Sequence, residues 1–116
     1  MKTSSCKAKG RKACQEVKDA ILLFYPELGK NDIIVASSGQ NGEDLIFSPK
    51  ARGLLPLSFE VKNREALNIW KSLEQARENA GKSIPILAFT RNRTPIYVAL
   101  ELHEFLKLTE PTATEE

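Results

Sequence analysis

The sequence is poor in the residues that build zinc sites and membrane spans. Among its 116 residues there is one histidine, His103, and there are two cysteines, Cys6 and Cys14, which lack C-x-x-C spacing. We therefore expect no zinc site and interpret both cysteines as reduced thiols of a cytoplasmic protein. No apolar run approaches the ~20 residues of a membrane-spanning helix. The basic, polar start is unlike a secretory signal, so we expect no membrane partner.

The composition fits one globular domain. Hydrophobic residues make up 41% of the chain and aromatic residues 7%, which argues against a disordered or fibrous protein. The length suits a single domain over residues 1–116. We expect its core at about residues 10–108, with flexible ends at 1–9 and 109–116.

Charge is unevenly distributed along the chain. The net charge is only +2, but residues 99–116 hold five acids and one base. The preceding 98 residues therefore carry sixteen bases against ten acids, a net of +6, and residues 1–12 hold five bases and no acid. A basic body suits a polyanionic partner such as DNA, because Lys and Arg contacts to phosphates release condensed counterions.

The hydrophobic pattern predicts the order αβββαββα. Spacings of three and four indicate helices, and short β-branched or alternating runs indicate strands. Three successive strands followed by a crossing helix favour a mixed central sheet flanked by helices. The predicted helices are 11–25, 66–80 and 101–108, the predicted strands are 33–37, 45–47, 57–62, 84–89 and 96–100, and 49–56 is a predicted loop.

Two acids and a lysine form the candidate chemistry. Glu60 and Lys62 lie two apart in a predicted strand, so both project from one face, opposite Leu57, Phe59 and Val61. Asp44 stands at the start of the strand before it, and a hairpin would bring its carboxylate to Glu60. Such a pair repels itself unless a cation lies between. Mg²⁺ suits these oxygen ligands, with the Val61 carbonyl as a further one.

The alternative is an exposed strand face with an ordinary ion pair between Glu60 and Lys62. The tripeptide itself decides nothing, because the same letters occur at Glu16-Val17-Lys18 within a predicted helix. Residues two apart on a helix do not face each other. The indication therefore comes from the strand context, the upstream acid after a glycine turn, and the following helix.

Three segments resemble the PD-(D/E)XK nuclease superfamily, and within it small Holliday junction resolvase-like and phage-encoded endonucleases. These segments are Gly42-Glu43-Asp44, Ser58-Phe59-Glu60-Val61-Lys62-Asn63 and Leu73-Glu74-Gln75-Ala76. The resemblance covers about residues 10–108 and implies an αβββαβ restriction-endonuclease-like core. It further implies Mg²⁺-dependent DNA hydrolysis, with Mn²⁺ able to substitute, on branched or junction DNA. It also implies a homodimer in a bacterial, archaeal or phage-infected cell.

The resemblance also implies roles for single residues. Asp44 and Glu60 would bind the metal, Lys62 would be the catalytic lysine, and Glu16 would be an additional acid. Gln75 would be auxiliary, although its helical position faces solvent. Glu43 stands where the family motif has proline, so Glu43 is an alternative ligand, and we prefer Asp44 because the strand positions it.

Predicted phosphate contacts group near this site. Arg91 and Arg93 would extend them. Trp70 is tempting as a base-stacking platform, but it lies in an apolar stripe and we expect it in the core. Restriction-type, nicking or end-processing nucleases, and a non-catalytic nucleic-acid-binding module, remain alternative functions. The predicted contact residues are Lys9, Arg11, Lys12, Ser38, Gln40, Lys50 and Arg52.

Overall fold

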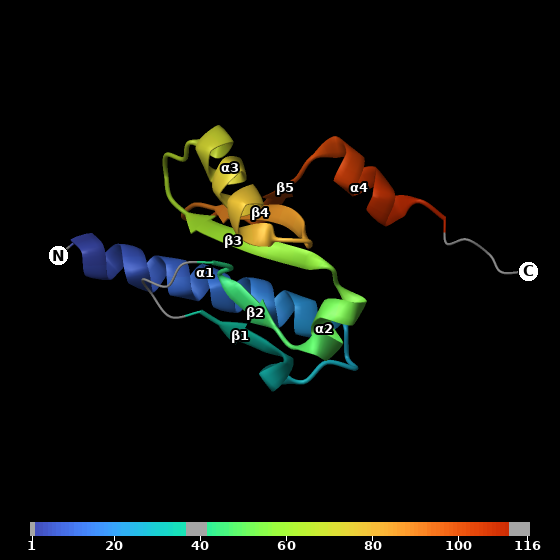
Figure 1. Cartoon of the computed structure of the whole chain (residues 1–116). Coiled ribbons are helices and arrows are strands. Elements are labelled where there is room, and N and C mark those ends of the chain that lie inside the picture. The colour runs from blue at the N-terminus through green and yellow to red at the C-terminus, as the bar shows by residue number, and fades with distance from the viewer. Residues whose placement is uncertain (1, 37–41, 112–116) are drawn as a thin grey trace, which may run out of the picture.

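The predicted helices and strands are all present, in the predicted order (Figure 1). The computed structural model describes residues 2–36 and 42–111, with side chains from residue 9 onward. Within these ranges no helix combines the length and the apolar character that a membrane crossing requires. The elements are α1 (Lys2–Phe24), a 3₁₀ turn η1 (Lys30–Asp32), β1 (Ile33–Val35), β2 (Leu45–Phe47), α2 (Pro49–Leu54), β3 (Leu57–Asn63), α3 (Ile69–Ala80), β4 (Ile84–Thr90), β5 (Tyr97–Ala99) and α4 (Leu102–Thr109).

The strands form a mixed α/β architecture, which confirms the predicted class. β1 and β2 pair in antiparallel fashion, while β3, β4 and β5 form a second sheet in that order. β3 and β4 are parallel, and β4 and β5 are antiparallel. The single predicted sheet is thus two sheets, which are joined by a backbone hydrogen bond of 3.1 Å from the Asp44 N–H to the Phe59 carbonyl.

Helices cover both faces of β3 (Figure 1). On the α1 side, Phe59 and Val61 belong to the main hydrophobic core together with Ala13, Cys14 and Val17 of α1. The predicted alternation of β3 is therefore correct on this face. On the opposite face α3 lies across β3 and β4. As a result, the polar face of β3 is covered rather than open to solvent.

The predicted loop 49–56 contains a short helix, α2. Ser48 is its N-cap, with an extended backbone and a hydroxyl that accepts from the Ala51 N–H at 3.1 Å. Pro49 at the first helical position already has a helical φ and needs no N–H partner there. The loop prediction gave too much weight to Pro49 and Gly53 as helix breakers.

The helix α1 begins at Lys2 rather than Arg11, so the backbone of residues 2–9 is helical and not frayed as predicted. The helix α3 begins at Ile69, later than the predicted Ala66. Asn68 caps it, because its side-chain oxygen accepts from the Lys71 N–H at 3.0 Å. The predicted stop at Gly81 is correct, and this glycine has a positive φ of 59°.

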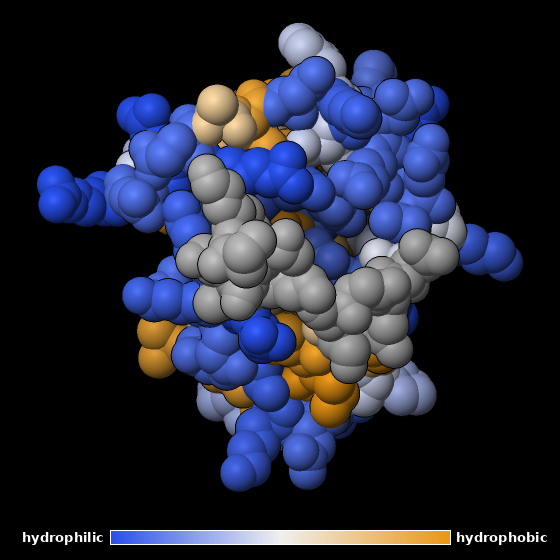
Figure 2. Space-filling model, turned by 90° about the vertical axis from the view of Figure 1, so that its left-hand side faces the viewer, coloured by the Kyte–Doolittle hydropathy of each residue, from blue (hydrophilic) through white to orange (hydrophobic). Residues whose placement is uncertain are grey.

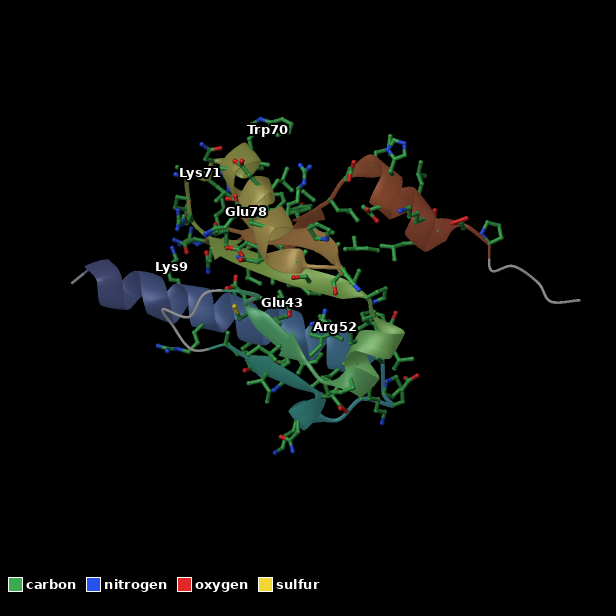
Figure 3. All side chains as sticks on the ribbon, in the orientation of Figure 1. Lys9, Glu43, Arg52, Trp70, Lys71 and Glu78 are labelled. Atoms are coloured by element: carbon green, nitrogen blue, oxygen red, sulfur yellow. The ribbon has the colours of Figure 1, made fainter. Side chains whose placement is uncertain are left out.

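The prediction that Trp70 lies in the core is wrong. Its side chain is 81% exposed and points away from the sheet at the top of α3 (Figure 3). The side of α3 that faces the sheet buries Ser72, Ala76 and Ala80 instead. These small residues recur every four positions, so they form one ridge and let α3 approach the sheet closely.

We predict that Ser48→Ala lowers the free energy of unfolding by about 1 kcal/mol, because it removes the N-cap of α2. It also removes the hydroxyl that donates to the Asp32 carboxylate at 2.7 Å. Urea unfolding monitored by circular dichroism measures the change. Ser48→Asp restores a capping oxygen but places a second carboxylate beside Asp32, so Ser48→Thr is the better rescue variant. An unchanged midpoint for Ser48→Ala would show that the Ser48 hydroxyl contributes nothing to stability.

Candidate active site

Asp44 lies where the two sheets meet. Its backbone carbonyl accepts from the Ala36 N–H at 3.0 Å, and its N–H donates to Phe59. Its carboxylate Oδ2 accepts from the Val61 N–H at 2.7 Å. Since Phe59 and Val61 flank Glu60 in β3, these hydrogen bonds fix the Asp44 carboxylate beside Glu60. The structure thus brings together the two acids that the sequence analysis paired.

Glu60 and Lys62 form a largely buried ion pair. Lys62 Nζ lies 3.3 Å from Glu60 Oε2. Glu60 is 5% exposed and the Lys62 side chain 16%. The alternative of an exposed strand face is therefore wrong, because α3 covers this side of β3. Burying such a pair is costly and is a weak route to stability. Its presence is more typical of a functional site.

The two carboxylates are held in an unfavourable electrostatic state. Burial raises the pKa of Asp44 above its ordinary value, although the Val61 N–H and Lys62 oppose that rise. Burial also raises the pKa of Glu60, and the negative charge of Asp44 raises it further, against Lys62 and Asn79. Both shifts follow from removing negative charge from water in a confined space. A divalent cation between the two acids would relieve the repulsion.

The available ligands are oxygen atoms, which suit Mg²⁺ and not zinc. Val61 directs its N–H toward Asp44, and in an extended strand the carbonyl of the same residue points to the same side. The Val61 carbonyl is therefore on the same side of β3 as the Asp44 carboxylate, whose charge acts on Glu60. No group of three or more His, Cys, Asp or Glu side chains occurs among the described residues. Mg²⁺ is often held by only one or two carboxylates with water and phosphate.

Asn79 is the residue of α3 that reaches the site. Its side chain lies close enough to Glu60 to lower the pKa of that carboxyl. Gln75, the auxiliary residue implied by the resemblance, is exposed on α3, as its helical position indicated. Asn79 was missed, although one signal was present in the sequence: it adjoins Ala80 and lies three residues after Ala76, at the edge of the buried ridge.

Cys14 is the residue of α1 that faces the acids. Its pKa is raised to about 12 by burial and by the charges of Asp44 and Glu60. A raised pKa of this kind favours the protonated thiol at neutral pH. Glu16, predicted as an additional acid, lies on the exposed side of α1. None of the described contacts brings it to Asp44 or Glu60.

Glu43 and Arg52 form an ion pair. Arg52 Nη2 lies 2.8 Å from Glu43 Oε1, and Figure 3 shows the two side chains near each other. Arg52 Nη1 donates to the Leu57 carbonyl at 2.6 Å and to Ser83 Oγ at 3.1 Å. Arg52 thus packs α2 against β3, and its prediction as a phosphate contact is corrected. Its partner Glu43 is correspondingly placed away from Glu60.

The predicted phosphate contacts fall at two ends of β3. Lys50 lies on α2, near the start of β3. Lys9 lies at the other end (Figure 3), where its carbonyl accepts from Asn63 Nδ2 at 3.3 Å. Ser38 and Gln40 lie outside the described residues. Lys50 and Lys9 therefore do not form one continuous track.

Basic residues gather where β3 ends at Asn63 and β4 ends at Thr90, and we call this region the basic end. Arg64 and Lys71 belong to this group, and the sequence analysis did not name them as contacts. Viewed from this end, the described surface is mainly hydrophilic (Figure 2). The acidic Glu65 also lies here. The basic end comprises Lys9, Arg11, Lys12, Arg64, Lys71, Arg91 and Arg93.

Comparisons of the chain with protein-family models, with curated proteins and with solved structures found no match. Function is therefore inferred from the geometry and electrostatics of the site itself.

We predict that Asp44→Asn raises the melting temperature of the metal-free protein. The amide oxygen can still accept from Val61, while one of two repelling charges is lost. A carboxyl group whose pKa is raised on folding destabilises the native state above that pKa, and the penalty disappears as the pH falls below its unfolded value. The gain should therefore be largest at neutral pH and should shrink toward pH 4. We expect on the order of 4–8 °C for each kcal/mol relieved.

Thermal unfolding between pH 4 and 8 in the presence of a chelator provides the measurement. Asp19→Asn is the matched control, because Asp19 is an exposed acid on α1 that bonds Gln15. A lower melting temperature for Asp44→Asn at pH 7, with the control unchanged, would contradict the electrostatic account.

Proposed function

We propose that this chain is a divalent-metal-dependent endonuclease that hydrolyses DNA phosphodiester bonds. One observation carries the proposal: Asp44 and Glu60 are held together out of water, each with a raised pKa, and Lys62 lies against Glu60. Groups kept in such a state favour binding of a hard cation over stability of the free protein. The resemblance to the PD-(D/E)XK superfamily agrees with this chemistry.

Each residue has a distinct role in this proposal. Asp44, Glu60 and the Val61 carbonyl would hold Mg²⁺, or Mn²⁺ in its place. The bound metal would supply the Lewis acidity that polarises the phosphate and acidifies a water. Lys62 lies 3.3 Å from Glu60, so its ammonium group would stand beside the metal ligands. Lys62 would donate to the attacking water or to a phosphoryl oxygen, where negative charge develops.

The phosphate chemistry needs positive charge around it, and the basic end provides that charge. The hydrolytic step adds water across one P–O bond: the water oxygen bonds to phosphorus and the departing sugar oxygen takes up a proton. Contacts from Lys9, Arg64 and Arg91 would hold backbone phosphates and would carry little sequence information. We therefore propose structural recognition of branched or junction DNA rather than readout of a base sequence.

We further propose that the chain works as a homodimer through α4. Leu102, Phe105 and Leu106 lie on one side of this helix and are all exposed. Beside the start of α4 lies a groove of about 490 Å³ lined by Trp70 and Leu100, among others. The charged residues Glu74, Arg77 and Glu101 also line this groove, and a groove with apolar and charged walls suits an amphipathic helix. Because every chain carries both parts, two copies could exchange helices around a two-fold axis and form a closed pair. Symmetric cleavage of two strands requires two such sites.

We predict that Glu60→Gln reduces cleavage of a four-way DNA junction in Mg²⁺ by at least about a hundredfold, since loss of even an indirect metal contact costs 10–100-fold. Gel analysis of labelled strands measures the rate, and Asp19→Asn should cleave as the wild type does. Undiminished cleavage by Glu60→Gln would exclude the proposed mechanism. Equal rates on junction and linear duplex would favour a restriction-type or end-processing nuclease.

Thermal shift gives a second readout of the same site, independent of activity. Mg²⁺ should raise the melting temperature of the wild type, because a ligand that binds only the native state stabilises it. The shift should be absent from Glu60→Gln. Binding of DNA without any Mg²⁺ shift would instead indicate a non-catalytic nucleic-acid-binding module.

We predict that Phe105→Glu keeps the chain monomeric. Sedimentation velocity should show a concentration-dependent dimer for the wild type only. Trp70 is the one tryptophan in the sequence, so its emission reports directly on the groove. That emission should move to shorter wavelength as the wild-type concentration rises, and should stay constant for Phe105→Glu. Phe24→Glu, at another exposed aromatic on a helix, is the control. A wild type that remains monomeric at high concentration would contradict the α4 exchange.

A further inference from the structure

A pocket lies beside the candidate active site, in the same row of the sheet. Lys62 pairs with Phe89 across β3 and β4, and Phe89 pairs with Tyr97 across β4 and β5. Residues that pair across neighbouring strands point to the same face, and adjacent strands lie about 4.8 Å apart. Lys62, Phe89 and Tyr97 therefore form one row on the α3 side of the sheet.

The floor of this pocket is aromatic and open. The Phe89 and Tyr97 rings have centroids 6.2 Å apart and are tilted by 33°. Tyr97 is 55% exposed, so a face of its ring is available. Apolar side chains of the segment that starts α3 complete the lining, and the pocket measures about 320 Å³. This volume is at the small end of the range for ligand sites.

Two arginines stand at the rim. Arg64 and Arg91 both line the pocket and both are exposed. The single acid in the lining, Glu65, accepts from the Asn92 N–H at 2.8 Å and so holds the turn after β4. The Thr90 hydroxyl donates to the Thr94 carbonyl at 2.7 Å and fixes the same turn. The pocket is thus formed without a ligand, with positive charge outside and aromatic rings inside.

We propose that this pocket binds one unpaired nucleotide of the DNA strand that enters the active site. Its base would stack on Tyr97 and Phe89, and its phosphates would contact Arg64 and Arg91. This inference rests on the proposed nuclease function and narrows the substrate class. A base within an intact duplex is stacked on its neighbours and cannot enter. The preferred substrates would therefore carry unpaired nucleotides beside the scissile phosphate, as flaps, loops or opened junctions do.

The test is fluorescence anisotropy with a labelled oligothymidine of about 12 nucleotides, in Ca²⁺ so that hydrolysis does not interfere. A labelled duplex of the same length is the comparison probe. We expect Tyr97→Ala to weaken oligothymidine binding about tenfold, as loss of one stacking side chain does. Duplex binding should change little. Tyr97→Phe should retain the affinity of the wild type, because the ring remains.

Two further variants control for a nonspecific loss of binding and for unfolding of Tyr97→Ala. Phe24→Ala removes another exposed aromatic residue, on α1, and should leave binding intact. Arg91→Ala removes a rim charge from an exposed turn, so it tests the pocket even if Tyr97→Ala unfolds. Wild-type affinity for oligothymidine in both Arg91→Ala and a folded Tyr97→Ala would overturn the proposal. An equal loss of duplex binding in Tyr97→Ala would overturn it too.

Failure here and failure of the nuclease proposal are distinguishable. The Mg²⁺-dependent rise in melting temperature depends on Asp44 and Glu60 and should persist in Tyr97→Ala. If that rise persists while the pocket variants bind oligothymidine normally, the pocket assignment is wrong and the metal site stands. If the rise is absent from the wild type, the metal-dependent nuclease itself is wrong.

Discussion

The hydrogen bond from the Val61 N–H to the Asp44 carboxylate connects the architecture of this protein to its candidate chemistry. It crosses the junction between the β1–β2 pair and the three-stranded sheet, close to the backbone bond from Asp44 to Phe59. A carboxylate in this position completes the pairing that β2 is too short to provide. The same contact brings the Asp44 charge beside Glu60. The contact that joins the two sheets is thus also the contact that places the charges of Asp44 and Glu60 close together.

This arrangement is a compromise between stability and binding. A neutral side chain would fill the junction without the cost of buried charge, and a hydrophobic pair could replace Glu60 and Lys62 at little or no penalty. The chain instead surrounds the acids with groups that only partly compensate them: Lys62, the Asn79 amide and one backbone N–H. Cys14 of α1 feels the charge of both acids, but its thiol is neutral and balances neither of them. In the free protein, the negative charge of Asp44 and Glu60 is therefore only partly balanced, and a bound cation would supply the missing positive charge.

The parts of the fold that follow local periodicity were predictable from the sequence. The alternation of β3 identified its buried side, and therefore the common face of Glu60 and Lys62. The glycine at position 81 ended α3 where only a positive φ closes the helix. These conclusions needed no knowledge of long-range packing. Asp44 was paired with Glu60 on the expectation of a hairpin between their strands. That hairpin is absent, because β2 and β3 belong to different sheets, and the backbone bond from Asp44 to Phe59 brings the two segments together instead.

Other features depend on long-range packing, and there the sequence analysis failed. The apolar stripe of α3 included Trp70, but a ridge of Ser72, Ala76 and Ala80 lets the helix lie closer to the sheet and turns the large ring outward. Arg52 looked like a phosphate contact because it is a basic residue in a predicted loop, but its ion pair with Glu43 bridges α2 and the start of β2. Asn79 and Cys14 each reach the acids from a separate helix. No spacing within one segment contains that information.

The placement of charge along β3 restricts how a nucleic acid could approach. At the start of the strand, Arg52 is occupied by Glu43, Leu57 and Ser83, and the exposed Lys50 is the other positive charge of α2. At its other end, Asn63 ties the strand to α1, and Arg64 follows directly. The row from Lys62 through Phe89 to Tyr97 begins at this same end. Lys62, at one end of the row, lies 3.3 Å from Glu60, and Tyr97, at the other end, lines the aromatic pocket. Under the proposed function, the cleavage chemistry and the recognition of an unpaired strand would therefore lie on the same face of one sheet.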